Sequence, residues 1–139
     1  MKRLFIPLIA ISFFSLKAYA AKECPVKVSD LEKVSQEYAN ASTNFRSATR
    51  EYLDGTNKDE LINFIRTGSA SSDFLYLNRT MCKSSQEHIN AAYKLRKLAE
   101  QMIYLCKAPI TEIKDMMTKA ENERIEIMEI HGCSMHSDL

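Results

Sequence analysis

Residues 73–107, DFLYLNRTMCKSSQEHINAAYKLRKLAEQMIYLCK, have the pattern of one long α-helix. This stretch contains neither glycine nor proline, and its apolar or small side chains recur at alternating spacings of three and four residues. That spacing places them on one face of an α-helix, and a helix of this length would extend about 50 Å. The predicted stripe consists of Phe74, Leu77, Met81, Ser84, His88, Ala91, Leu95, Leu98, Met102 and Leu105.

The same spacing on the N-terminal side predicts another long helix. Ser29 is expected to start it, because Ser29 and Glu32 have the three-residue spacing of a capping box. Gly55 is expected to end it as a left-handed C-cap residue. Its stripe consists of Leu31, Val34, Tyr38, Ala41, Phe45, Ala48 and Tyr52.

A short helix is predicted between the two long ones. Thr56 or Asn57 can cap its start, and Gly68 marks its end. Its apolar positions are Leu61, Phe64 and Ile65. A polar connector at 69–72 then leads into the helix at 73–107.

A fourth helix follows Pro109, which breaks the preceding helix and is expected to be the first residue of the new one. Gly132 is expected to end it. No segment of the chain alternates with a period of two, so the predicted fold class is all-α. The loops are short, which favours an antiparallel bundle of three long helices plus one short helix. The fourth seam consists of Ile110, Ile113, Met117, Ala120, Ile127 and His131.

Residues 1–20 have the composition of a cleavable signal peptide. Lys2 and Arg3 are positive, residues 4–16 are almost wholly apolar, and Ala18 and Ala20 are small residues at the −3 and −1 positions of the cleavage site. The alternative is an uncleaved anchor, but the apolar run of about 13 residues falls short of the roughly 20 that span a membrane. We therefore expect a mature single helical domain, residues 21–139, in the periplasm or outside the cell.

Removal of this leader changes the charge balance. It leaves 16 of the 19 basic residues against 18 acidic ones, a net charge near −2. A chain with this charge has no general attraction to nucleic acid or to anionic membranes. We therefore expect neither as a partner, and no stable membrane insertion of the mature chain.

Four cysteines remain in the mature chain: Cys24, Cys82, Cys106 and Cys133. An even number in a small exported domain indicates two disulfides. A zinc site is the alternative, but such sites usually contain a close Cys-x-x-Cys pair, which this chain lacks.

The antiparallel arrangement predicts how these cysteines pair. Counting back from the turn at Pro109, Cys133 comes level with about position 85, one turn from Cys82. The first helix runs opposite to the third, so Cys24 falls near the end where Cys106 lies. We therefore predict the disulfides Cys24–Cys106 and Cys82–Cys133.

Few residues suggest chemistry. His131, Met135 and His136 are ligand types that copper prefers, so a small metal-binding carrier is one hypothesis, and a merely polar chain end is the favoured interpretation. His88 has Ser84 and Ser85 one turn away, but nothing in the sequence orients them as a nucleophile–histidine dyad. We interpret His88 as a hydrogen-bonded core histidine. No haem, phosphate-loop or zinc-protease motif occurs, so we expect no cofactor and no enzymatic activity.

One corner is more apolar than a single helix stripe requires. Either the short helix covers these side chains, or some of them form a surface that binds another protein. Tyr76 and Leu75 lie off the stripe and are expected to face outward. The predicted partner-binding set is Phe64, Ile65, Phe74, Leu75, Tyr76 and Leu77.

The sequence therefore favours an exported, non-enzymatic protein-binding module. An accessory component of a cell-envelope secretion or conjugation apparatus fits this description. An inhibitor or immunity protein against a toxin or hydrolase is the alternative binder, and the metal carrier is the alternative of another class.

Overall fold

The computed structural model describes residues 24–139, and the predicted signal peptide lies outside this range. The described chain forms α2 (Val28–Gly55), α3 (Lys58–Thr67), α4 (Ser72–Cys106), α5 (Thr111–Ile130) and the short 3₁₀ helix η1 (Cys133–Met135). No strand occurs in this range. The all-α prediction of three long helices and one short one is therefore confirmed.

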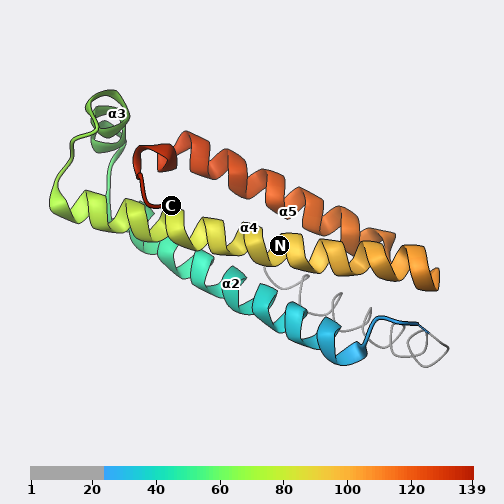
Figure 1. Ribbon diagram of the computed structural model, residues 1–139. Coiled ribbons are helices and arrows are strands. Elements are labelled where there is room, and N and C mark those ends of the chain that lie inside the picture. Colours follow the sequence, from blue (N-terminus) through green and yellow to red (C-terminus); the bar gives the residue numbers. More distant parts are fainter. Residues whose placement is uncertain (1–23) are drawn as a thin grey trace.

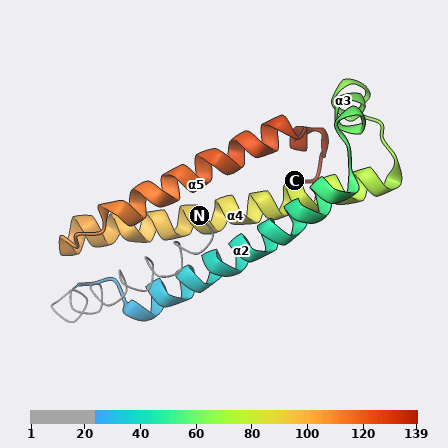
Figure 2. The same cartoon turned by 180° about the vertical axis from the view of Figure 1, so that it is seen from behind.

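The central helix of the bundle is α4, which packs against both α2 and α5. Both neighbours run antiparallel to it, on opposite sides in the two views (Figure 1 and Figure 2). The short helix α3 lies beside the N-terminal end of α4, outside the row of the three long helices (Figure 1). This arrangement follows from the short connections, which return each helix along its predecessor.

The predicted stripe of α2 faces the core. Six of its seven residues are buried and Val34 is half-buried. The predicted ends of this helix are wrong. It begins at Val28 with Lys27 as N-cap and no side-chain cap, so Ser29 lies inside the helix. Gly55 is its last residue, and the C-cap is Thr56 in an extended conformation. Gly55 is instead close to α4, because a Cβ there would lie 2.6 Å from Leu77 Cδ1.

The caps of α3 and the start of α4 agree with the sequence. Asn57 and Glu60 form a reciprocal capping box at the start of α3. Gly68 ends α3 in the left-handed conformation, with φ of 73°. Ser71 caps α4, since its hydroxyl accepts from the N–H of Phe74. The stripe of α4 is buried or half-buried except for Leu105, which is 54% exposed and whose predicted place in the core is wrong.

The turn between α4 and α5 differs from the prediction. Lys107 ends α4 in the left-handed conformation, and α5 begins at Thr111 with Ile110 as its N-cap. Pro109 therefore precedes the helix and is not its first residue. At the other end, His131 is the C-cap and Gly132 turns the chain with φ of 68°. The predicted stop at Gly132 is thus correct to within two residues.

Both predicted disulfides are present. Cys24–Cys106 joins the start of α2 to the end of α4, with the Cα atoms 5.2 Å apart. Cys82–Cys133 joins the first half of α4 to the segment after α5, with the Cα atoms 5.5 Å apart. Each end of the bundle is thereby fixed by one covalent link.

The core is divided into two clusters. The larger lies around the middle and C-terminal half of α4, with Leu31, Leu95 and Met117 among its members. The smaller lies at the α3 end and contains Tyr52, Phe64, Phe74, Met81 and the disulfide Cys82–Cys133. The helix α3 and the C-terminal segment pack on this smaller cluster.

Candidate functional site

One buried side chain anchors α3 to the bundle. Phe64 is 2% exposed and is the only residue of α3 that is fully buried. Its ring lies 5.3 Å from that of Phe74 on α4 and 5.5 Å from that of His136 in the C-terminal segment. The remaining apolar side chains of this helix are half-buried or exposed, so α3 presents most of its surface outward.

The C-terminal segment completes the seat of α3. A Cβ on Gly132 would lie 3.5 Å from the Phe64 ring and 3.1 Å from Ile65 Cγ1, so the backbone of 132 is pressed against α3. The disulfide Cys82–Cys133 holds the next residue onto α4. The position of α3 therefore depends on residues about 65 positions later in the chain.

A buried asparagine fixes this segment by hydrogen bonds. Asn78 is fully buried on α4. Its Nδ2 donates to the backbone oxygen of His131 at 3.0 Å, and its Oδ1 accepts from His136 Nε2 at 2.7 Å. His131 Nδ1 is 3.1 Å from the Tyr52 hydroxyl on α2. Three elements of the fold thus meet at two histidines.

The two imidazoles and the methionine of the proposed metal set have separate partners. Burial lowers the pKa of His131, and burial together with the nearby Arg79 lowers that of His136. Met135 lies beside Gly68, at the end of α3. Residues 24–139 contain no group of three or more His, Cys, Asp or Glu side chains that could hold a metal ion. The geometry therefore gives the carrier hypothesis no support.

The six predicted partner-binding residues do not form one surface. Phe64 and Phe74 are buried against each other, while Leu75 and Leu77 are half-buried. Ile65 and Tyr76 are 45% and 69% exposed. Tyr76 lies about 200° around α4 from Phe74, which faces α3, so it points to the other side of the helix.

The structure adds two apolar residues that the sequence analysis missed at this corner. Ile62 on α3 and Met135 in η1 are each 44% exposed. Ile62 lies between the stripe positions Leu61 and Phe64 and therefore carried no periodic signal. Met135 was considered only as a metal ligand. The exposed apolar surface of the corner, here called the α3 surface, consists of Ile62, Ile65 and Met135.

His88 is a core histidine, as interpreted from the sequence. Its ring lies between Tyr38 and Phe45, with centroids 5.0 and 5.6 Å away. Its Nδ1 accepts from Arg124 Nε at 3.1 Å, and the Arg124 guanidinium lies 4.1 Å from the Phe45 ring centroid. Burial, with the positive charge of Arg124, lowers the His88 pKa to about 4.

No hydroxyl is activated at His88 in this geometry. Ser85 Oγ donates to the backbone oxygen of Met81 at 2.9 Å, and the imidazole Nδ1 is already occupied by Arg124. His88 Nε2 is buried and has no partner within the described residues. His88 on α4 thereby contacts both α2 and α5. The site lacks the oriented nucleophile that a dyad requires.

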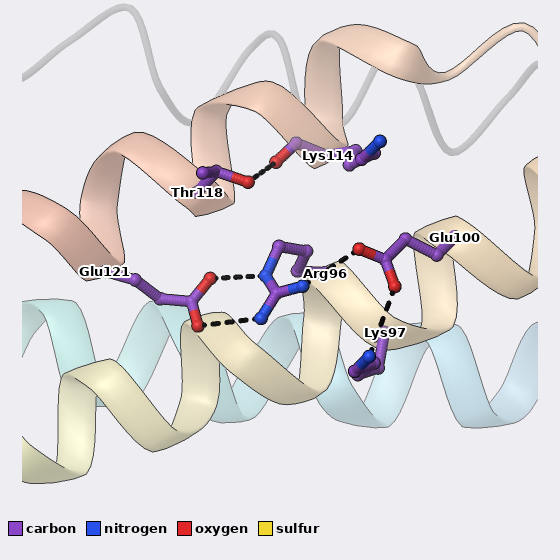
Figure 3. Close-up of polar contacts among 6 residues, drawn as sticks. All are labelled: Arg96, Lys97, Glu100, Lys114, Thr118 and Glu121. Carbon is purple, nitrogen blue, oxygen red and sulfur yellow. Dashed lines mark hydrogen bonds and ion pairs between the residues drawn. The ribbon is translucent and has the colours of Figure 1, made fainter.

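An ion-pair network joins α4 to α5 on the face turned away from α2 (Figure 3). Arg96 donates to both oxygens of Glu121, at 2.5 and 3.2 Å, and to Glu100 at 2.9 Å. Lys97 pairs with Glu100 as well. The hydrogen bond from Arg96 lowers the pKa of Glu100. Among residues 24–139, Arg96–Glu121 is the one ion pair between a base of α4 and an acid of α5.

Comparisons with protein families, curated proteins and solved structures found no match to this chain. No helix within residues 24–139 is long and apolar enough to cross a membrane. The candidate functional site is therefore defined by geometry alone. It is the α3 surface together with the contacts that hold α3 in place.

Proposed function

We propose that this chain is an exported, non-enzymatic protein-binding module and that the α3 surface is its contact site. The observation that supports this is the exposure of α3. Phe64 is the one fully buried residue of the helix, while Ile62 and Ile65 are 44% and 45% exposed. Apolar side chains on a short, projecting helix can enter a partner's groove at little entropic cost, as interface anchors do.

The same proposal includes export. Residues 1–20 would direct the chain out of the cytoplasm and be removed before Ala21. The two disulfides support an oxidising destination, the periplasm or the exterior, because such bonds rarely persist in the cytosol. An accessory role in a secretion or conjugation apparatus of the cell envelope would use such a stapled, catalytically inert module.

Substitutions on the α3 surface test this function. Tagged protein is crosslinked in the envelope fraction of the producing cells, and the crosslinked peptides are identified by mass spectrometry. We expect crosslinks from 58–67, and we expect Ile62→Asp to reduce capture at least tenfold while thermal stability stays within a few degrees, because Ile62 is partly exposed and lies away from the contact with Gly132. N-terminal sequencing of the captured chain is expected to start at Ala21.

Tyr76→Asp is the matched control for the opposite side of α4. It also replaces an exposed apolar residue by an acid, and we expect it to leave capture unchanged. Equal loss in both variants, or crosslinks confined to other helices, would contradict the α3 assignment. A toxin or hydrolase captured through α3, and inactive when bound, would identify the chain as an inhibitor.

A further inference from the structure

A groove between α4 and α5 opens on the face turned away from α2. Its volume is about 530 Å³, and its apolar lining comes from Ile89 on α4, from Ile125 and Met128 on α5, and from Leu139 at the chain end. Cys133, Ser134 and His136 of the C-terminal segment close one end of it. Ile125 is 45% exposed. Gln86 and Glu129 lie at its polar rim. The C-terminal segment contributes to both this groove and the seat of α3, but none of the three residues of the α3 surface lines the groove.

The apolar residues of the groove lie at one level along the bundle. Two contacts set the register, the disulfide Cys82–Cys133 and the ion pair Arg96–Glu121. Ile89 lies midway between the two α4 members of these contacts. Ile125 and Met128 lie between the two partners on the other side, Glu121 on α5 and Cys133 in η1. The patch is therefore a band across both helices.

An exposed aromatic residue extends this band. Tyr93 lies one turn after Ile89, and its ring is covered in part by the guanidinium of Arg96, 5.1 Å from the ring centroid. The network of Figure 3 borders the band on the side toward the C-terminal end of α4. The groove patch, as we name it, consists of Ile89, Tyr93, Ile125 and Met128.

The edges of this face carry opposite charge. Lys83 lies on the α4 edge, and Glu126 and Glu129 lie on the α5 edge, all three exposed. None of the three takes part in an ion pair within residues 24–139. Glu129 is one turn before Cys133, and Lys83 directly follows its disulfide partner Cys82. Lys83 and Glu129 are therefore within about one turn of the same level.

We propose that the groove patch is the contact between two copies of this chain. A two-fold axis parallel to the helices and lying between the copies sets α4 of one copy on α5 of the other. This rotation keeps every residue at its level. Ile89 then meets Ile125 of the second copy, and Lys83 lies near Glu129 of the second copy. The apolar band of one copy thus meets the apolar band of the other, and each basic edge meets an acidic edge. An isologous dimer interface requires this self-complementarity.

Sedimentation velocity of the purified protein tests the dimer. We expect a concentration-dependent shift from monomer to dimer over about 1–200 µM, the range for interfaces of modest affinity. Ile125→Glu is expected to weaken dimerisation at least tenfold. Ile62→Glu is the matched control, because Ile62 is 44% exposed on α3, and it is expected to dimerise like the parent. A parent protein that stays monomeric throughout overturns the proposal.

A charge exchange tests the two-fold arrangement itself. Lys83→Glu and Glu129→Lys each place like charges opposite one another in both contacts of the homodimer, so each variant alone is expected to dimerise more weakly. In a one-to-one mixture, the heterodimer has two attractive contacts, one with reversed sign and one as in the parent, and it is expected to form as readily as the parent dimer. This test avoids the core, so it remains informative if Ile125→Glu proves misfolded. A mixture no more dimeric than its components contradicts the arrangement.

Discussion

At the scale of single residues, His88 shows how a polar side chain is accommodated in a core. Its ring is stacked on Phe45 and lies at a tilt to Tyr38, both on α2, and its Nδ1 accepts from Arg124 on α5. The imidazole must be neutral to accept that hydrogen bond. Protonation would put a second positive charge beside a guanidinium, in a site with little water. His88 therefore joins α2, α4 and α5 favourably only while its imidazole is neutral.

The stability of the fold should accordingly depend on pH. The His88 pKa is about 4 in the folded state and 6.5 as its ordinary value, so the unfolded chain binds the extra proton between these limits. This contribution to stability is fully present above pH 6.5 and is lost as the pH falls toward 4, and the total loss by pH 4 is about 3 kcal/mol. His131 and His136, whose pKa values are also lowered, act in the same direction.

Urea unfolding from pH 7 to pH 4 measures this effect. In His88→Gln, the amide oxygen can still accept from Arg124, but the side chain does not titrate. We expect the free energy of unfolding of this variant to fall less steeply over the range than that of the parent. Parallel curves would show that His88 makes no pH-dependent contribution.

At the scale of elements, α3 is the helix whose position depends most on other parts of the chain. Its side chain Phe64 is buried in the bundle, and Phe64 and Ile65 lie against the backbone of Gly132. Two left-handed glycines control this region, Gly68 at the end of α3 and Gly132 after α5. They differ in surroundings, since a Cβ at 68 would meet only the flexible end of Met135, at 3.5 Å.

Alanine substitutions at the two glycines should therefore differ in cost. Gly68→Ala carries the left-handed strain alone, about 1 kcal/mol. Gly132→Ala adds crowding against Ile65 and Phe64, so we expect a total loss of about 2–3 kcal/mol. Chemical denaturation of both variants measures the difference. Equal losses would show that α3 moves aside freely and is not held by the C-terminal segment.

The sequence predicted the helices better than their ends and corners. Buried stripes such as that of α2 follow from periodicity, because a helix core face repeats regularly. Ser29 did not cap α2, because any residue can occupy an N-cap once tertiary packing sets where the helix starts. Exposure at the corner depended on contacts between distant segments. Phe64 is buried partly because His136, far along the chain, packs on it. Whether Tyr76 lies on the same side of α4 as α3 can be known only once the position of α3 is known.

At the scale of the whole molecule, the two disulfides stabilise different regions. Cys24–Cys106 closes a separation of 82 residues, and Cys82–Cys133 closes one of 51. By loop entropy alone each contributes about 4 kcal/mol to stability. Only the second holds the segment on which α3 rests.

Paired cysteine-to-serine variants should separate these effects. We expect Cys82→Ser with Cys133→Ser to raise amide hydrogen exchange throughout 58–67 and 131–136. Cys24→Ser with Cys106→Ser is the control, with faster exchange at the opposite end of the bundle and unchanged protection in α3. Hydrogen exchange measured by mass spectrometry resolves these segments. Protection of α3 that survives loss of Cys82–Cys133 would show that Phe64 alone secures it.

The two disulfides also interleave along the chain, and this affects biogenesis. Cys82 lies between the members of the first pair, and Cys106 lies between the members of the second. A chain exported as proposed, from its N-terminus, presents Cys24 and Cys82 together before either native partner emerges. Oxidation in order of emergence would trap this wrong pair. Correct maturation therefore requires that oxidation wait until α4 has packed, or that a thiol–disulfide isomerase exchange the early bond.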